Sequence, residues 1–256
     1  MNVPIDKQSS SKGGVRPTTG IVPVVLIRHA QSEWNRENRF TGWADPPLTE
    51  EGIAEAVRAG NALRDQGYCF DVAFSSRLQR AVLTTDILLQ RLKQEDIPRH
   101  EDWRLNERHY GALQGQDKVR AIKQVGEHKV WRWRRGYIDL AEPLSRHDIH
   151  HPVHDERYAD VDPAVLPDVE SLAQTRARVV TFWNQRILPL IRVGKRVLIS
   201  AHGNTLRALL MKLDGMSIPE VEAFEIPTAT PIVYAFDPGG RTLGWRYLDI
   251  TNRLEL

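Results

Sequence analysis

Two histidines each lie just beyond a short apolar segment of the chain. His29 follows residues 21–27, which are rich in valine and isoleucine, and His202 follows residues 196–200. A neutral imidazole is a competent nucleophile toward phosphorus, and its attack gives a covalent phosphohistidine. The two positions therefore indicate phosphoryl transfer, provided that the fold brings the histidines into one pocket.

The neighbouring residues suit this chemistry. Arg28 precedes His29, Arg80 begins a predicted helix, and residues 203–205 open another helix. Phosphoryl transfer needs mainly positioning and stabilisation of negative charge, so cationic side chains should crowd the site. Free N–H groups at a helix start can hold phosphate oxygens. The plainer interpretation is that each histidine ends a strand and meets solvent, but two such histidines beside these groups argue against it.

The elements that must position these residues follow from the apolar patterning. Short apolar runs predict strands at residues 21–27, 70–74, 196–200, 231–236 and 245–248. Helical spacing predicts helices at residues 49–63, 78–92, 172–190 and 205–213. Alternating strands and helices indicate an α/β fold, a three-layer sandwich with a mainly parallel sheet flanked by helices. Ligands of such sheets bind beyond the carboxyl ends of the strands, where both histidines fall.

The chain divides into a leader and one predicted domain. Residues 1–20 are rich in Ser, Gly, Lys, Pro and Thr and are predicted to form a flexible leader. Residues 21–256 are predicted to form a single domain. Within it, residues 95–168 combine many charges with prolines and lack sustained periodicity, so we expect an irregular insertion that covers the active site.

Composition narrows the class of protein. The 256 residues are 41% hydrophobic and 27% charged, which is ordinary globular composition, and the net charge of +2 is too small to imply a polyanionic partner. The one cysteine, Cys69, fits a reducing cytosol. No apolar stretch approaches the length of a membrane span. We therefore expect a soluble, cytoplasmic protein without a membrane partner.

Four motifs carry a specific resemblance. They are residues 28–35 with 39–43 (RHAQSEWN and RFTGW), 105–115 (LNERHYGALQG), 133–136 (WRRG) and 201–209 (AHGNTLRAL). In this order they resemble the signatures of the 2,3-bisphosphoglycerate-dependent phosphoglycerate mutases, which belong to the histidine phosphatase superfamily. The resemblance runs from about Val24 to about Leu248, which is nearly the whole chain beyond the leader.

The resemblance implies roles for particular residues. It implies that His29 becomes phosphorylated, and that His202, Arg28 and Arg80 stabilise the transferring group. It also implies that Glu107 is the general acid and base for the substrate hydroxyl. The residues that match substrate-binding positions are Arg28, Asn35, Thr41, Gly42, Arg80, Glu107, Tyr110, Lys118, Arg134, Arg135, Gly203 and Asn204.

The resemblance also implies a reaction and its requirements. The expected activity is the interconversion of 3-phosphoglycerate and 2-phosphoglycerate in glycolysis and gluconeogenesis, an isomerase reaction that passes through a phosphohistidine. It requires priming by 2,3-bisphosphoglycerate and no metal, because protein cations neutralise the charge. The expected partners are small phosphoglycerates, together with further copies of the chain in a dimer or tetramer.

Three departures bear on the activity. Typical members have glycine and glutamate where this chain has Ala30 and Gln31. Ala30 is unfavourable only if the backbone there needs a positive φ, and Gln31 lacks a negative charge near Arg28, which could alter how strongly phosphate is held. The chain stops at Leu256 without the alanine- and lysine-rich tail common in the family, so weaker exclusion of water could raise hydrolysis. These features leave the balance between mutase and phosphatase open.

Other functions stay open at this point. The nearest is a histidine phosphatase that hydrolyses small phosphate esters, and a second is a non-catalytic phosphometabolite-binding protein. The histidines and aspartates of residues 147–155 have spacings that could suit a metal, but such loops are only compositional hints. For that reason we expect no metal. Residues 131–135 interleave tryptophan and arginine as single-strand nucleic-acid binders do. We expect no nucleic acid because the net charge is near neutral and Arg134 and Arg135 match a substrate clamp.

Overall fold

Six strands form one sheet in the computed structural model, which describes residues 20–250. The predicted leader therefore lies outside the described residues, apart from Gly20. The strands are β1 (Val22–Arg28), β2 (Val72–Ser75), β3 (Arg99–Glu101), β4 (Val197–Ala201), β5 (Ile232–Phe236) and β6 (Thr242–Tyr247), and their order across the sheet is β3-β2-β4-β1-β5-β6.

The centre of the sheet is parallel. β1 pairs in parallel with β4, β4 with β2, and β2 with β3, whereas β5 is antiparallel to both of its neighbours. Alternate residues of a strand point to opposite faces, and both faces of β1 are buried. Val24 and Leu26 enter one core cluster, while Val25 and Ile27 enter another. The continuous apolar run at residues 21–27 reflects burial on both sides.

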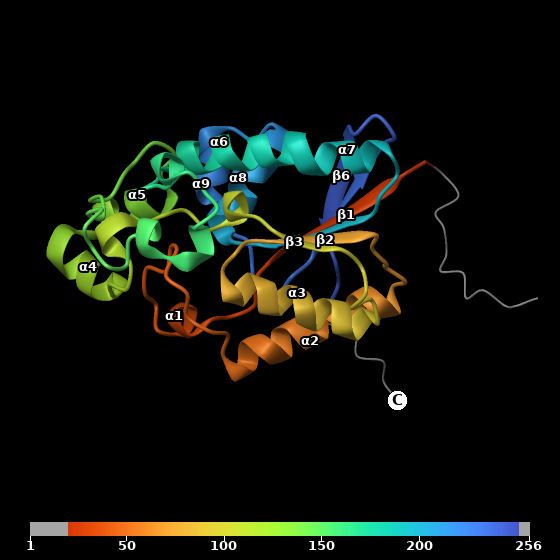
Figure 1. Ribbon diagram of the computed structural model, residues 1–256, viewed down its shortest axis with the longest axis horizontal. Coiled ribbons are helices and arrows are strands. Elements are labelled where there is room, and N and C mark those ends of the chain that lie inside the picture. Colours follow the sequence, from red (N-terminus) through yellow and green to blue (C-terminus); the bar gives the residue numbers. More distant parts are fainter. Residues whose placement is uncertain (1–19, 251–256) are drawn as a thin grey trace, which may run out of the picture.

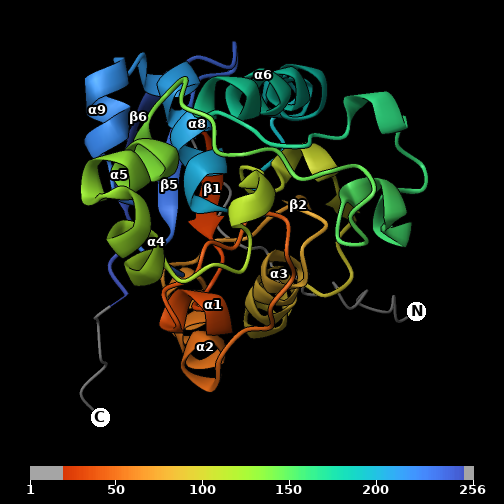
Figure 2. The same ribbon diagram turned by 90° about the vertical axis from the view of Figure 1, so that its left-hand side faces the viewer.

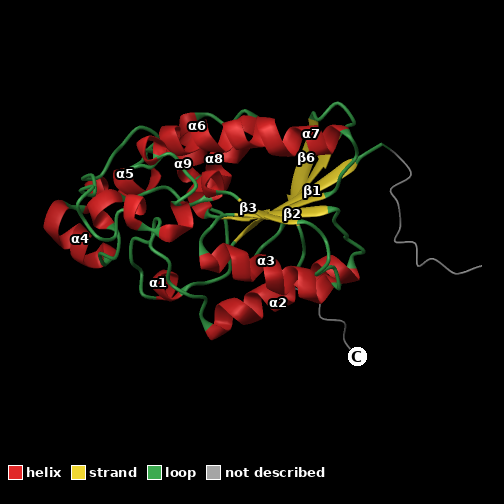
Figure 3. Cartoon of the chain, in the orientation of Figure 1, coloured by secondary structure: helices red, strands yellow, loops and turns green. Residues whose placement is uncertain are grey.

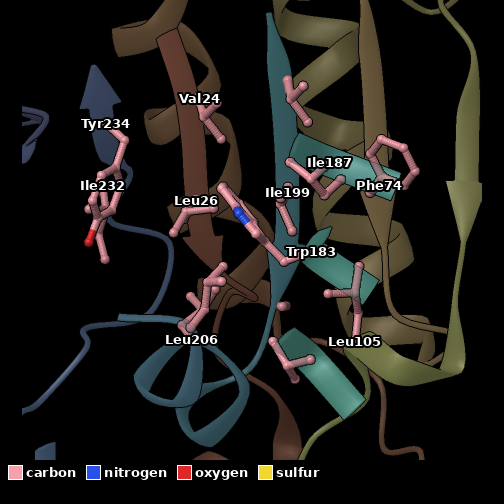
Figure 4. Packing of buried hydrophobic residues seen from close by; sticks show 14 of the residues in the cluster. Val24, Leu26, Phe74, Leu105, Trp183, Ile187, Ile199, Leu206, Ile232 and Tyr234 are labelled. Carbon is pink, nitrogen blue, oxygen red and sulfur yellow. The ribbon is translucent and has the colours of Figure 1, made fainter. Parts of the chain in front are cut away.

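Helices cover both faces of the sheet, as Figures 1 and 3 show. One layer holds α2 (Glu50–Asp65) and α3 (Gln79–Leu92). The other holds α6 (Leu172–Phe182), α7 (Leu188–Arg192) and α8 (Gly203–Asp214), with a π-helical turn at Trp183–Ile187 between α6 and α7. Figure 4 shows Trp183 and Leu206 of this layer beside Leu26 and Ile199 of the sheet. The predicted three-layer α/β fold is confirmed.

The segment between β3 and α6 is built mainly from short pieces. It contains α4 (Lys118–Val125), α5 (Glu127–Arg135) and 3-10 turns at Trp103–Leu105, Gly111–Leu113, Pro152–His154, Glu156–Tyr158 and Pro163–Val165. Figure 2 looks toward the end of β1, around which α1 (Glu33–Arg36), α4, α5 and α8 are grouped. The prediction that the irregular insertion begins at residue 95 was wrong, because residues 99–101 pair with β2 as the edge strand β3.

Side-chain caps fix where the site's supporting helices begin. The Thr49 hydroxyl accepts a hydrogen bond from the main-chain N–H of Gly52 at the start of α2. Ser171 and Gln174 form a reciprocal capping box at the start of α6. The short helix α9 (Ile218–Ala223) begins at a further capping box. Within residues 20–250, no helix is both long and apolar enough to cross a bilayer.

Candidate active site

The two histidines meet because their strands are neighbours in register. Arg28 at the end of β1 pairs with Ala201 at the end of β4, and the main-chain N–H of His29 donates to the oxygen of Ala201 at 2.9 Å. His29 and His202 are therefore the next residues along two adjacent strands. Their ring centroids lie 4.9 Å apart. This confirms the expectation that parallel pairing brings both histidines to one end of the sheet.

His29 presents one ring nitrogen to the site. Its Nδ1 lies 2.7 Å from the main-chain oxygen of Ala30, so Nδ1 carries the proton and Nε2 keeps its lone pair. Burial, followed by the positive charges of Arg80 and Arg28, holds the pKa of His29 well below its usual value. The imidazole is therefore neutral at pH 7, which is the form that attacks phosphorus.

Arg80 places a fixed cation beside that nitrogen. Its Nε donates to Nε2 of His29 at 3.3 Å, and its two terminal nitrogens donate to the main-chain oxygens of Gly42 and Ala44, each at 2.9 Å. Asp45 lies 3.8 Å away. Burial lowers the pKa of Arg80 to about 10, so the guanidinium stays charged at neutral pH. Its charge is available to oxygens of a phosphoryl group on Nε2.

A cavity of about 130 Å³ opens above His29 at this end of the sheet. Every predicted site residue except His202 lines it, and Arg39, Arg207, Glu225 and Ile226 complete the lining. The lining includes the seven cationic residues Arg28, Arg39, Arg80, Lys118, Arg134, Arg135 and Arg207, against only two carboxylates, Glu107 and Glu225. Such a concentration of positive charge in a small cavity suits a compact ligand with several negative groups.

His202 lies behind His29 and has no exposed surface. Its Nε2 is 2.7 Å from the hydroxyl of Ser76, whereas its Nδ1 is buried and has no hydrogen-bond partner among residues 20–250. Burial, together with Arg80 and His29, holds the pKa of His202 well below its usual value. His202 is therefore a second neutral imidazole, positioned to act on a group attached to His29.

Glu107 joins the insertion to the start of α8. Its carboxylate accepts the main-chain N–H of Arg108 at 2.7 Å and that of Asn204 at 3.2 Å. The sequence predicted free N–H groups at this helix start for phosphate oxygens, but the N–H of Asn204 is already engaged by Glu107. The helix start instead holds the carboxylate at the wall of the cavity, where it can exchange a proton with a bound hydroxyl.

Cations from α4 and α5 also line the cavity. Arg134 and Arg135 lie at the end of α5, where Arg135 pairs with Glu225. Lys118 begins α4, and burial together with Arg134 and Arg28 lowers its pKa to about 8. Lysine with this pKa is still mostly protonated at pH 7. The insertion therefore supplies positive charge at a distance in sequence from Arg28 and Arg80.

Sequence reasoning missed two arginines that line the cavity. Arg207 on α8 donates to the side-chain oxygen of Asn204 and to the main-chain oxygen of Arg134, the latter at 3.1 Å. Burial lowers its pKa to about 9. Its position three residues after Asn204 on a helix was the available signal. Arg39 was visible only as the first residue of the RFTGW motif.

The structure places the first two departures from the family pattern outside the cavity. Within residues 20–250, positive φ among non-glycine residues occurs at Asn38, Lys93 and Ala229, and so not at Ala30. Ala30 is fully buried in a small apolar cluster. The Gln31 side chain accepts the Thr49 hydroxyl at 2.9 Å and does not line the cavity. The Gln31 side chain therefore supports the start of α2, and its effect on phosphate binding stays a prediction.

The histidine-rich segment makes ordinary contacts. Nε2 of His151 lies 2.9 Å from Asp168, and Nε2 of His154 lies 2.8 Å from the main-chain oxygen of Arg146. In the part of the chain that the structure describes, no group of three or more His, Cys, Asp or Glu residues is arranged to hold a metal ion.

A neutral histidine at the carboxyl end of a parallel strand, with a second histidine and arginines around it, is an arrangement suited to phosphoryl transfer. The chain belongs to the histidine phosphatase superfamily (branch 1), whose family model matches residues 24–147 and 140–247. It is therefore an enzyme of phosphoryl transfer or hydrolysis.

Solved structures share the fold at low identity. A phosphoglycerate mutase from Bacillus anthracis is 21% identical with a TM-score of 0.65, covering 91% of this chain and 95% of its own. An alpha-ribazole phosphatase from Shigella flexneri is 21% identical with a TM-score of 0.66, covering 92% and 100%. A mycobacterial glucosyl-3-phosphoglycerate phosphatase is 22% identical with a TM-score of 0.61, covering 89% and 97%. Mutases and phosphatases thus share this architecture.

Proposed function

We propose that the protein is a phosphoglycerate mutase that interconverts 3-phosphoglycerate and 2-phosphoglycerate through phospho-His29. The observation that carries the proposal is the division of charge in one small cavity. Arg28 and Arg80 lie beside His29, whereas Lys118, Arg134 and Arg135 approach from the insertion. A phosphoglycerate carries a phosphate and a carboxylate on a short carbon chain, so it can engage both groups of cations at once.

Glu107 supports the isomerase reaction in particular. When phospho-His29 transfers its group, the bond from Nε2 to phosphorus breaks and a bond from phosphorus to the substrate hydroxyl oxygen forms. The Glu107 carboxylate accepts the hydroxyl proton, and Arg28, Arg80 and His202 stabilise the transferring group. In the return step Nε2 of His29 accepts the other phosphoryl group of the substrate, and Glu107 gives the proton back.

The site suits the primer that this reaction needs. Nε of Arg28 and Nδ1 of His202 are both buried, and neither has a hydrogen-bond partner among the described residues. Both are donors that an oxygen of a phosphate ester would satisfy. When bound, 2,3-bisphosphoglycerate supplies the phosphoryl group that charges His29. We further propose that the enzyme works in the cytoplasm, in glycolysis and gluconeogenesis, as a dimer or tetramer.

Hydrolysis is the second candidate function. The same fold and a similar degree of likeness are found in solved structures of two phosphatases. The same His29, Arg80 and His202 arrangement would form a phosphohistidine, and water would then take the place of the substrate hydroxyl as acceptor. Fold alone therefore does not decide between the two reactions.

The test is isomerisation of 3-phosphoglycerate by purified protein, with and without catalytic 2,3-bisphosphoglycerate, while free phosphate is monitored. Rapid, primer-dependent isomerisation with little phosphate release supports the mutase. Phosphate release without isomerisation establishes the phosphatase instead. His29→Ala is the control, because it removes the nucleophile for both reactions. Binding of phosphoglycerate without any phosphohistidine would make the protein a non-catalytic binder and overturn the proposal.

A further inference from the structure

Ser76 follows β2 and is fully buried. Its hydroxyl oxygen accepts the main-chain N–H of Leu78 at 3.2 Å and lies 2.7 Å from Nε2 of His202. The second contact joins residues 126 positions apart in the chain. Ser76 does not line the cavity, and none of the sequence motifs includes it. Its short contact with a histidine beside the nucleophile nevertheless gives it a way to affect the chemistry.

The direction of this hydrogen bond follows from what surrounds the hydroxyl. A serine hydroxyl has one proton to donate and two lone pairs to accept with. The N–H of Leu78 can only donate, so it occupies one lone pair. Among residues 20–250, Nε2 of His202 is the acceptor within reach of the hydroxyl proton. Because buried hydroxyls are normally satisfied, the Ser76 hydroxyl donates to Nε2.

A donor at Nε2 decides which nitrogen of His202 carries the proton. A neutral imidazole has one N–H, and Nε2 must present its lone pair to the serine. The proton of His202 therefore resides on Nδ1. That nitrogen is buried without a partner among the described residues, while the ring lies 4.9 Å from the ring of His29. The free protein thus holds an unused donor on a ring that lies close to the ring of His29.

We propose that Ser76 is a positioning residue that fixes His202 in the Nδ1–H form, so that this N–H donates to an oxygen of the phosphoryl group on His29. The part that concerns the phosphoryl group rests on the proposed phosphohistidine. In the opposite form, Nδ1 would direct a lone pair at a negatively charged oxygen and repel it. Ser76 would then contribute to transfer without touching the substrate.

The tautomer is measured directly by nuclear magnetic resonance of the protein labelled with ¹⁵N-histidine, because the shifts of protonated and unprotonated ring nitrogens are well separated. We expect the wild-type protein to show His202, assigned by its loss in His202→Gln, with the proton on Nδ1. A proton on Nε2 in the wild-type protein overturns the proposal without any variant of Ser76. This measurement is made on the free protein and does not depend on whether it is a mutase or a phosphatase.

Ser76→Ala then tests the cause. Without the serine proton, we expect the ring to change to the Nε2–H form or to a mixture, and an unchanged Nδ1–H form overturns the proposal. Ser200→Ala is the matched control, because Ser200 is also fully buried but its hydroxyl has no partner among the described residues. The control should leave the His202 signals unchanged.

The consequence for phosphoryl binding is measured with orthovanadate, which mimics a phosphoryl group. Loss of one preorganised donor to a developing oxyanion typically costs about 10²-fold in rate. We expect Ser76→Ala to slow formation of phospho-His29 by about that factor and to weaken orthovanadate binding, with KM for 3-phosphoglycerate changing much less. Equal rates in Ser76→Ala and Ser200→Ala would overturn the role of Ser76 in transfer. Absence of phosphohistidine in the wild-type protein would instead count against the proposed function.

Discussion

Arg178 donates a hydrogen bond to the main-chain oxygen of Glu107 at 2.9 Å, across 71 positions of sequence. The same guanidinium donates to the oxygens of Arg104 and Asn106, each at 2.8 Å, and pairs with Glu170 at 2.7 Å. Arg178 therefore ties the segment that carries Glu107 to α6. Because α6 packs on the central sheet, the main chain that carries the Glu107 carboxylate is anchored to a rigid element.

Arg178→Lys is expected to lower kcat while leaving KM nearly unchanged. Lysine keeps the positive charge near Glu170 but cannot direct hydrogen bonds to three carbonyl oxygens in the arginine geometry. Loosening of Glu107 should cost about 10-fold or more in kcat, since small displacements of catalytic groups are expensive. The measurement pairs steady-state kinetics with thermal unfolding. Arg176→Lys on the same helix is the control, because the described residues offer its side chain no ion pair. An equal loss in both variants would contradict the prediction.

Glu107→Gln should impair proton transfer and leave binding intact. The amide keeps the shape of the side chain but cannot take the hydroxyl proton, so we expect kcat to fall by roughly 10²- to 10⁴-fold. Binding of 3-phosphoglycerate, measured by calorimetry, should change only a few-fold. Glu51→Gln is the matched control, because Glu51 forms an exposed pair with Arg58 on α2, and such pairs contribute little. Normal turnover by Glu107→Gln would remove Glu107 from the mechanism.

Binding should weaken as the pH rises above about 8. Lys118 faces Arg134, Arg28, Asp117 and Glu107, and its lowered pKa of about 8 means that it loses its charge above that pH. The substrate phosphate is already fully ionised there, since its second pKa is about 6. Loss of a charged donor predicts a rise in KM of about 10-fold by pH 9.5. Lys118→Arg keeps its charge and should flatten this rise, whereas a wild-type KM that stays constant would contradict the assignment.

Stability should fall on acidification because of His109. This buried ring faces Glu170, His151, Arg178 and Asp168, and burial lowers its pKa to about 4. Between pH 6.5 and about 4, the unfolded chain binds a proton there that the folded protein does not. The free energy of unfolding therefore decreases as pH falls through this range, by about 3 kcal/mol in total for this residue.

His109→Asn isolates that contribution. The Nδ1 of His109 accepts the main-chain N–H of Gly111 at 3.1 Å, and the side-chain oxygen of asparagine can accept the same bond without titrating. Urea unfolding of both proteins at pH 7 and pH 5 should show a smaller loss of stability in the variant. Parallel losses in the two proteins would show that His109 does not cause the pH dependence.

Much of the fold was readable from the sequence, for a physical reason. β1 and β4 are buried on both faces and appear as continuous apolar runs, while α2, α3 and α6 bury one stripe and keep helical spacing. The edge strand β3 was missed because all three of its residues are exposed and carry no apolar pattern. It pairs with β2 through backbone hydrogen bonds, and its one ring contact there, between His100 and Phe74, is not revealed by composition.

Site residues could be predicted from the sequence where they come directly after a strand or lie in a motif. The residues that support them from other elements could not. His29 and His202 follow strand ends, and the motifs contain five of the seven cationic residues of the lining, Arg80 and Lys118 lying outside them. The supporting contacts were not visible. Ser76 reaches His202 and Arg178 reaches Glu107 only because the strands and α6 adopt a particular register. Single residues that act across more than 70 positions leave no local pattern, so only the three-dimensional structure brings them to notice.

The register that pairs Arg28 with Ala201 means that the histidine pair and much of the substrate-binding lining are positioned by different parts of the chain. The spacing between His29 and His202 is set by backbone hydrogen bonds between β1 and β4 in the middle of the sheet. It therefore does not depend on the sequence of any loop. Several groups that would bind the rest of a substrate, among them Tyr110, Lys118 and Arg134, come from residues 102–171, outside those two strands. A descendant of this protein could therefore exchange that segment and accept a different ester while keeping both histidines in place.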